Sequence, residues 1–499
     1  MRKIYLLFIL SLWTSVMIAQ VKVFQESLYA PELLDTISYK VYLPQDWDGW
    51  DNTQRHPAIY AVNYGMVNGD FIAQQIAYFR KARYEIPNSL VVVIDANMER
   101  MGYQYETGDI TIEGQHFVSF IKNQLIPTVT RKYHTSPFAT YLGHSFAASF
   151  GSYLLRTEPG LFNGYILLAP EKVGREKPFR LTEDVLNTYN KQYTFVYSGV
   201  GEKDMQRRRD FAREIGREMS RASNDYLFFT YDSLPRADHT NILSMTMEFA
   251  LKSIYRFYTP YDDKEESNAF AALQQTADKL KRYYGLDPER NFTFYRPFAN
   301  EAVNNKDTLS LKKVLAYFNG PNLQGWNLMQ FGEFCLRLDM KPLAEAYFQQ
   351  AIKKIETQEM NLSTGPPNLL VCYQHLAVDI HPKNPPIAWM YLLKAKDVAL
   401  GNSRFIPHDG SVLLNLGKYA AQTGYQPEEA LEYLTSYRQG RYNYNYLAAY
   451  YQSLICQRNG EKKLAVRYVQ QGLEENPEDA DLIRLAKELG LNAGAKSSK

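Results

Sequence analysis

The 499-residue chain is poor in cysteine and almost balanced in charge. Its three cysteines, Cys335, Cys372 and Cys456, all lie in the C-terminal half among apolar residues. This odd number and apolar setting argue against a disulfide framework and favour small buried side chains. No cysteine–histidine spacing indicates a zinc site. With a formal net charge of only +2, the chain also lacks the field that would attract nucleic acid or an anionic membrane.

Long apolar runs are missing as well, except at the N-terminus. Two basic residues precede an apolar run from Ile4 to about Ile18, and the small residue Ala19 follows. This order is typical of a cleavable signal peptide, and the run is shorter than the about 20 residues that span a bilayer. We expect residues 1–19 to be a signal peptide and the protein to be secreted or periplasmic, with no stable membrane span. An uncleaved membrane anchor is the alternative.

Short apolar segments with the pattern of buried strands recur through the first half of the chain. Helical patterns separate them, as in residues 116–133, where apolar side chains recur at helical spacing. This alternation predicts an α/β fold, in which helices cover both faces of a mainly parallel sheet. Ligands bind at the carboxyl ends of such strands. The expected strands are residues 36–43, 58–62, 90–94, 139–142, 164–168, 193–197 and 226–230.

The segment from Thr140 to Ala147 has the pattern of a nucleophile elbow. An apolar strand leads into Gly143-His144-Ser145, and a helix rich in small residues follows. A sharp strand-to-helix turn of this kind lifts a serine hydroxyl above the sheet. It also directs the backbone N–H of Phe146 towards the position where a tetrahedral oxyanion would form. We therefore predict that Ser145 is a catalytic serine.

A catalytic serine of this fold needs a histidine that comes later in the chain, after an acid. Between Ser145 and the end of the α/β pattern near Pro260, the sequence has only one histidine, His239. It lies in a polar loop between an expected strand and an expected helix, where the general base of this fold is found. We predict that His239 is the base.

The acid is expected on the loop that follows residues 193–197, where both Asp204 and Glu202 stand. Asp204 is favoured because its spacing after the strand is the usual one, and Glu202 is the alternative. A carboxylate here would accept a hydrogen bond from the imidazole and stabilise its protonated form. The basic run Arg207-Arg208-Arg209 comes next, and we interpret it as a solvated helix start. Attraction of an anionic substrate is the other interpretation of this run.

The first half of the chain carries a series of short motifs in a fixed order: Phe120-Ile121, Leu125-Ile126-Pro127, Tyr133, Gly143-His144-Ser145, Glu158-Pro159-Gly160-Leu161-Phe162 and Ala169-Pro170. With these motifs, residues 28–260 resemble the family of α/β hydrolases that includes esterase D and the trilactone siderophore esterases. The resemblance implies the fold of a serine carboxylesterase and gives Ser145 and His239 the roles of nucleophile and base. It covers nearly all of the first half of the chain.

The chain departs from this family at two positions. Ala147-Ala148 stands where the family usually has two glycines after the elbow, which adds methyl groups without removing a reacting group. Asn63-Tyr64-Gly65-Met66 stands where the family commonly has Asp-Gly, in the loop that supplies the second oxyanion donor. We expect that donor to be the backbone N–H of Gly65 or Met66.

Beyond about residue 260, strand patterns stop and amphipathic helices take over. Residues 261–320 are expected to form a helical connector. In residues 321–499, small residues at helix contacts and prolines after second helices resemble tetratricopeptide repeats, with irregular spacing. The predicted organisation is therefore an α/β-hydrolase domain over residues 20–260, the connector, and an all-α repeat domain. The repeats either bind a peptide or protein partner or pack as a structural appendage.

Together these features predict a serine esterase with a Ser-His-Asp triad and an acyl-enzyme intermediate, which needs no cofactor or metal. The expected substrate is a small-molecule or carbohydrate-linked ester. Two alternatives remain open at this point. Acyl transfer to another acceptor uses the same residues, and a disabled hydrolase could serve as a binding scaffold.

Overall fold

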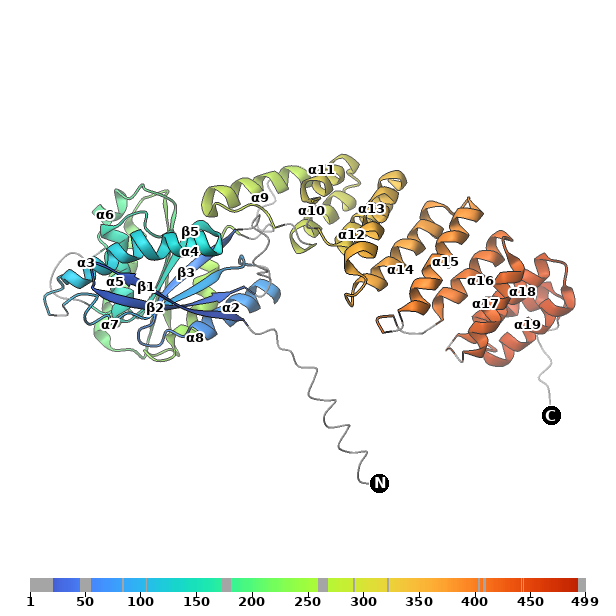
Figure 1. The fold of residues 1–499 in the computed structure, drawn as a ribbon, viewed down its shortest axis with the longest axis horizontal. Helices are drawn as coiled ribbons and strands as arrows, with labels where there is room; N and C mark the ends of the chain where they lie inside the picture. The colour runs from blue at the N-terminus through green and yellow to red at the C-terminus, as the bar shows by residue number, and fades with distance from the viewer. Residues whose placement is uncertain are drawn as a thin grey trace, which may run out of the picture. The chain divides into compact units, whose positions relative to one another are not determined.

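The computed structural model describes residues 21–44, 55–82, 85–104, 106–172, 181–258, 268–289, 292–320, 323–402, 404–406, 410–440, 442 and 444–491. The predicted signal peptide lies outside these residues. The chain divides into two compact units. One is an α/β unit that reaches Glu289, and the other is a helical unit that continues from Arg290. Figure 1 shows the sheet of the first unit and the helices of the second. Among the described residues, no helix combines the length and the apolar character needed to cross a membrane.

The α/β unit is built on one eight-stranded sheet in the order β1-β2-β4-β3-β5-β6-β7-β8. The first two strands and β4 pair antiparallel, whereas β4, β3, β5, β6, β7 and β8 run parallel to one another. This confirms the predicted mainly parallel sheet. The strands are β1 (Lys22–Ala30), β2 (Asp35–Leu43), β3 (His56–Val62), β4 (Leu90–Ile94), β5 (Thr135–His144), β6 (Gly164–Leu168), β7 (Thr194–Gly201) and β8 (Leu227–Leu234).

Helices cover both faces of this sheet, as predicted (Figure 1). One hydrophobic core joins alternate strand residues, such as Tyr60, Tyr141 and Val196, to the apolar faces of α3, α4, α5 and α7. On the other face, α2 and α8 pack against the strands and contact each other. These helices are α2 (Gly69–Ala82), α3 (Ile112–Phe120), η1 (Ile121–Leu125, a π-helical turn), α4 (Ile126–Tyr133), α5 (Phe146–Thr157), α6 (Glu183–Asn187), α7 (Gln206–Arg221) and α8 (Ile242–Ile254).

Strand β1 is the element of this sheet that the sequence analysis missed. Most of its side chains are exposed, including Phe24 and Tyr29, and its only partner in the sheet is β2. An edge strand with little burial does not produce the alternation of apolar and polar residues that marks a half-buried strand. Its main-chain hydrogen bonds to β2 define it instead.

The α/β unit extends further than residue 260, because part of the predicted connector belongs to it. Helix α9 (Ala269–Tyr284) and the residues up to Glu289 join it from Ala271 onwards. The ring of Tyr284 lies against Phe138 and Phe195, with centroids 5.0 and 5.5 Å apart, and its hydroxyl donates to the carbonyl of Ile254. Large aromatic surfaces that bury against the sheet explain this extension.

The helical unit packs its helices in successive pairs, which confirms an all-α C-terminal part (Figure 1). All three cysteines are buried within it, as expected from their apolar setting. The helices are α10 (Phe292–Asn304), α11 (Thr308–Phe318), α12 (Gly325–Arg337), α13 (Lys341–Lys354), η3 (Ile355–Glu359), α14 (Gly365–His375), η4 (Leu376–Ile380), α15 (Pro385–Gly401), α16 (Ser411–Thr423), α17 (Pro427–Gln439), α18 (Asn445–Arg458), α19 (Lys462–Glu475) and α20 (Ala480–Glu488).

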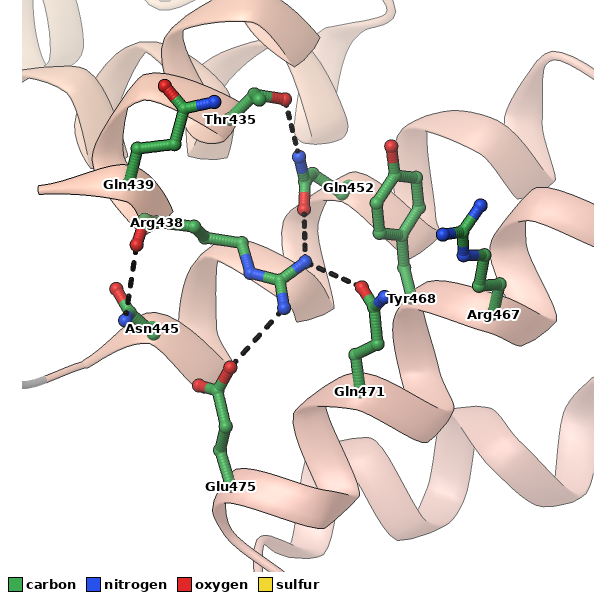
Figure 2. A pocket seen from close by; sticks show the side chains of 9 residues that line it. All are labelled: Thr435, Arg438, Gln439, Asn445, Gln452, Arg467, Tyr468, Gln471 and Glu475. Carbon is green, nitrogen blue, oxygen red and sulfur yellow. Dashed lines mark hydrogen bonds and ion pairs between the residues drawn. The ribbon is translucent and has the colours of Figure 1, made fainter. Parts of the chain in front are cut away.

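A polar hollow of about 360 Å³ lies between α17, α18 and α19 (Figure 2). The Arg438 guanidinium enters it and donates to Gln452 Oε1 and Gln471 Oε1, at 3.3 and 2.7 Å. Its second terminal nitrogen pairs with Glu475 at 3.3 Å. The charge of Arg438 is thus paired with Glu475, and its other terminal nitrogen donates to two side chains of the same hollow. We interpret this hollow as a hydrogen-bonded contact between consecutive helices.

Small residues set the distance between paired helices. Gly332 of α12 faces the ring of Phe348 on α13, and a Cβ at this position would lie 2.5 Å from that ring. Phe348 is fully buried, so the rigid ring has little room to withdraw. Gly401 of α15, by contrast, has open space where its Cβ would be.

We expect Gly332→Ala to lower the free energy of unfolding of the helical unit by about 1–2 kcal/mol, because overpacking outweighs the gain in helix propensity. The matched control Gly401→Ala should be neutral or slightly stabilising. The measurement is the urea midpoint of the full chain, with unfolding monitored by the circular dichroism signal of its helices. Equal midpoints for the two variants would contradict the close contact of α12 and α13.

Candidate active site

The predicted site residues lie on loops at the carboxyl ends of three parallel strands of the sheet, β5, β7 and β8. Ser145 follows β5, Asp204 follows β7 and His239 comes after β8. Main-chain hydrogen bonds continue past the strand ends and join these loops. The N–H of Ser145 donates to the carbonyl of Leu168 at 2.9 Å, and the N–H of Lys203 donates to the carbonyl of Ala237 at 3.0 Å. The structure thus brings the loops of all three residues to one edge of the sheet.

Ser145 has the strained backbone that a nucleophile elbow requires. Its φ of 59° and ψ of −121° lie in a region that residues with a side chain rarely adopt, and such strain costs about 1–3 kcal/mol. The turn is tight because β5 and α5 nearly touch. A Cβ on Gly143 would lie 2.4 Å from the carbonyl oxygen of Ala147, so only glycine fits there.

His239 and Asp204 form a direct hydrogen bond, with 2.9 Å between His239 Nδ1 and Asp204 Oδ2. The carboxylate of Asp204 is fully buried, whereas the His239 ring is 26% exposed. Glu202 is exposed, so the structure places the favoured acid and not the alternative beside the imidazole. Because an ionised carboxylate only accepts, Nδ1 must carry the proton, which leaves Nε2 as the basic nitrogen.

Asp204 is held in its ionised form. Burial raises the pKa of this carboxyl group, but hydrogen bonds from His239, Arg208 and the Met205 N–H outweigh that effect and lower the pKa to about 2. The carboxylate is therefore charged throughout the range in which a histidine base can act. It can stabilise a positive charge on His239 during a reaction.

Arg208 belongs to the site, although the basic run was interpreted as a solvated helix start. Its side chain is only 11% exposed, and Nη1 donates to Asp204 Oδ1 at 2.9 Å. Its Nε donates at 2.6 Å to the carboxylate of Glu171, which is buried just beyond β6. That interpretation is corrected for this arginine. The signal was available in the spacing, because Arg208 lies four residues after Asp204 at the start of α7.

The expected oxyanion donors flank the elbow. Phe146 begins α5, so its N–H lies at the positive end of a helix, and the rings of Tyr64 and Tyr103 pack against its side chain. On the loop after β3, the N–H of Met66 donates to His144 Nδ1 at 3.2 Å. His144, which was quoted only as part of the elbow motif, is thus a further residue of the site.

Comparison with known proteins agrees with this fold. Residues 31–240 match the family model described as "Putative esterase", which confirms the resemblance that the sequence motifs carried. Among curated proteins, no sequence matches the chain.

Solved structures resemble the chain in fold at low sequence identity. An uncharacterised protein from Capnocytophaga ochracea is 17% identical with a TM-score of 0.53, over 67% of this chain and 94% of that one. An IroE-like serine hydrolase from Shewanella oneidensis is 14% identical with a TM-score of 0.48, over 60% of this chain and 99% of that one. A siderophore hydrolase from Aspergillus nidulans is 14% identical with a TM-score of 0.38, over 48% and 95%. The mainly parallel sheet of the α/β unit gives it an α/β-hydrolase-like fold, and the family match supports an esterase function.

The ion pair of Arg208 with Asp204 generates a prediction on acid stability. A carboxyl group with a depressed pKa stabilises the folded state above its unfolded pKa, and this contribution is lost as the pH falls through the folded pKa, here about 2. Arg208→Gln removes one lowering contact and should raise the pKa of Asp204. The stability that the ionised Asp204 adds near neutral pH should therefore be smaller in this variant, and the variant should lose less stability on acidification than the wild type.

The measurement is the urea midpoint of the wild type and of Arg208→Gln across a pH series from about 3 to 7, the range in which carboxyl groups titrate. Arg213→Gln is the matched control, because Arg213 lies on the same helix but pairs with an exposed Asp210. Parallel pH curves for Arg208→Gln and the wild type would show that Arg208 does not hold the charge on Asp204.

Proposed function

We propose that the chain is a serine hydrolase of carboxylic esters, with Ser145 as nucleophile, His239 as base and Asp204 as acid. The observation that carries this proposal is the hydrogen bond of 2.9 Å between His239 and Asp204, on loops at the same sheet edge as the strained turn of Ser145. The match of residues 31–240 to an esterase family supports the same chemistry. The proposed substrate is a small-molecule or carbohydrate-linked ester. Secretion or export to the periplasm stays part of the proposal.

The proposed reaction begins when His239 Nε2 takes the proton of Ser145 as Oγ attacks the ester carbonyl carbon. The backbone N–H of Phe146 and a donor on the loop of Gly65 and Met66 stabilise the oxyanion. The imidazolium, stabilised by Asp204, then gives its proton to the leaving alkoxide oxygen, and the alcohol departs. Water next gives a proton to Nε2 as its oxygen attacks the acyl carbon. The imidazolium then returns a proton to Ser145 Oγ as the bond from Oγ to the acyl carbon breaks, which releases the acid and restores both residues.

The alanines that replace the usual glycines after the elbow do not argue for a disabled site. Ala147 and Ala148 are fully buried in the first turn of a regular α5, so their methyl groups pack into the core. Ser145, His239 and Asp204, to which the proposal gives the three catalytic roles, are all present. The second candidate, acyl transfer, differs only in which acceptor meets the acyl-enzyme, and a partner for the helical unit remains a separate proposal.

Ser145→Ala should abolish hydrolysis of a chromogenic acyl ester, because the attacking oxygen is gone. Labelling by a fluorophosphonate probe should be lost in parallel, and circular dichroism should match the wild type. A fully active Ser145→Ala variant would overturn the proposed function. An excess of added alcohol that diverts the acyl group from water would identify a transferase instead.

Asp204→Asn should lower kcat by about 10³–10⁴, since the base loses its orienting carboxylate. Glu202→Gln is the matched control on the same loop, and its kcat should stay within a few-fold of the wild type. The test is steady-state hydrolysis of the same ester by both variants. If the two losses were reversed, Glu202 would be the acid.

A further inference from the structure

His144 lies between two loops that the proposed chemistry needs in fixed positions. It is the last residue of β5 and is fully buried. On one side, its Nδ1 accepts the N–H of Met66, on the loop after β3, at 3.2 Å. On the other side, its Nε2 lies 3.0 Å from the carbonyl oxygen of His239. The two imidazole rings are in contact, with centroids 4.4 Å apart.

These two hydrogen bonds define the protonation state of the His144 ring. A backbone N–H can only donate and a carbonyl can only accept, so Nδ1 must be bare and Nε2 must carry the hydrogen. A protonated ring would lose the contact with Met66. Burial, followed by the positive charge that His239 can carry, lowers the pKa of His144 to about 4, which keeps this ring neutral at neutral pH.

The ring also restricts the backbone of the neighbouring loop. Gly65 has a φ of 65°, and a Cβ there would lie 2.2 Å from His144 Nδ1. The imidazole therefore packs directly on the Gly65 backbone, in a space that only glycine leaves open. The loop is held by van der Waals contact at Gly65 and by a hydrogen bond at Met66.

The hydrogen bonds of this loop separate the two expected oxyanion donors. Asn63 donates its N–H to Ile94, Tyr64 to Val62, and Val67 to Tyr64. Met66 donates to His144. Within residues 63–67, Gly65 has the one backbone N–H for which the described part of the chain offers no acceptor. Of the two expected donors, Gly65 is the one whose N–H remains for a ligand.

We propose that His144 is a positioning residue that ties the loop of Gly65 and Met66 to the loop of His239, and so presents the Gly65 N–H and the His239 imidazole to the same reacting carbonyl. This inference rests on the proposed function. It acts through geometry, because donor and base must both lie within about 3 Å of their targets, and an error of about 1 Å costs about 10²-fold in rate.

Three variants separate the two hydrogen bonds of His144. In His144→Asn, the side-chain oxygen takes the place of Nδ1 and can accept from Met66, while the donor to His239 is lost. In His144→Gln, the amide nitrogen can reach the place of Nε2 and donate to the His239 carbonyl, while the acceptor for Met66 is lost. His144→Phe keeps the ring volume and removes both bonds.

We expect His144→Phe to lower kcat for a chromogenic ester by about 10²-fold with KM changed only a few-fold, as for a misplaced donor and base. Asn and Gln should each restore part of kcat. This partial rescue and the split between kcat and KM would not follow from a merely structural role. The melting temperature of each variant is measured first, and all assays are run at a temperature at which every variant is folded. An unchanged kcat in His144→Phe would overturn the proposal and leave the esterase proposal intact.

A second measurement does not depend on activity. In the wild type labelled with ¹⁵N-histidine, the His144 signals, assigned by their loss in His144→Asn, should show a neutral ring with the hydrogen on Nε2 at neutral pH. A hydrogen on Nδ1, or an imidazolium, would overturn the positioning role even in an inactive protein. An inactive wild type with the expected signals would instead refute the esterase proposal alone, because the histidine would still tie the two loops.

Discussion

The parallel pairing of β5, β6, β7 and β8 is the constraint on which the candidate site depends. Because these strands run parallel, the loop that follows each of them lies at the same edge of the sheet. The strands also end at the same level, since Gly143 of β5 pairs with Leu167 of β6, and Leu168 of β6 pairs with Gly199 of β7. The hydrogen bonds that continue beyond the strands then hold the loops of Ser145, Asp204 and His239 at the same edge of the sheet. Residues nearly a hundred positions apart in the chain, such as His144 and His239, thereby come into contact.

A chain of largely buried acidic and basic side chains holds Asp204 in place. Glu171 contacts Arg208, Arg208 contacts Asp204, and Asp204 contacts His239. Buried charges are costly unless each is paired, and here the inner charges have partners on both sides. Asp204 is thus kept ionised by an arginine that is itself held in place from beyond β6. The acid is a member of a network and not an isolated carboxylate.

Much of this arrangement could be predicted from the sequence, because the informative patterns are local or follow from chain order. The elbow around Ser145 needs only a strand, a glycine and small residues, and His239 is the only histidine in the required stretch. Strand β1 was missed because its side chains are largely exposed. Arg208 was missed because a run of three arginines is typical of a solvent-exposed helix start. In the structure, however, the helix directs the side chain of Arg208 towards the buried Asp204. The role of His144 depends on contacts with residues 78 and 95 positions away, which no local pattern shows.

The unfavourable backbone of Ser145 has a consequence for when this chain can become reactive. A serine in relaxed, extended polypeptide has no reason to adopt a φ of 59°, so the turn exists only while β5 and α5 are packed together. The core around Tyr141, whose hydroxyl donates to the Ala147 carbonyl, supplies that packing. A nascent or unfolded polypeptide therefore carries an ordinary alcohol, and chemical competence arrives together with the tertiary structure.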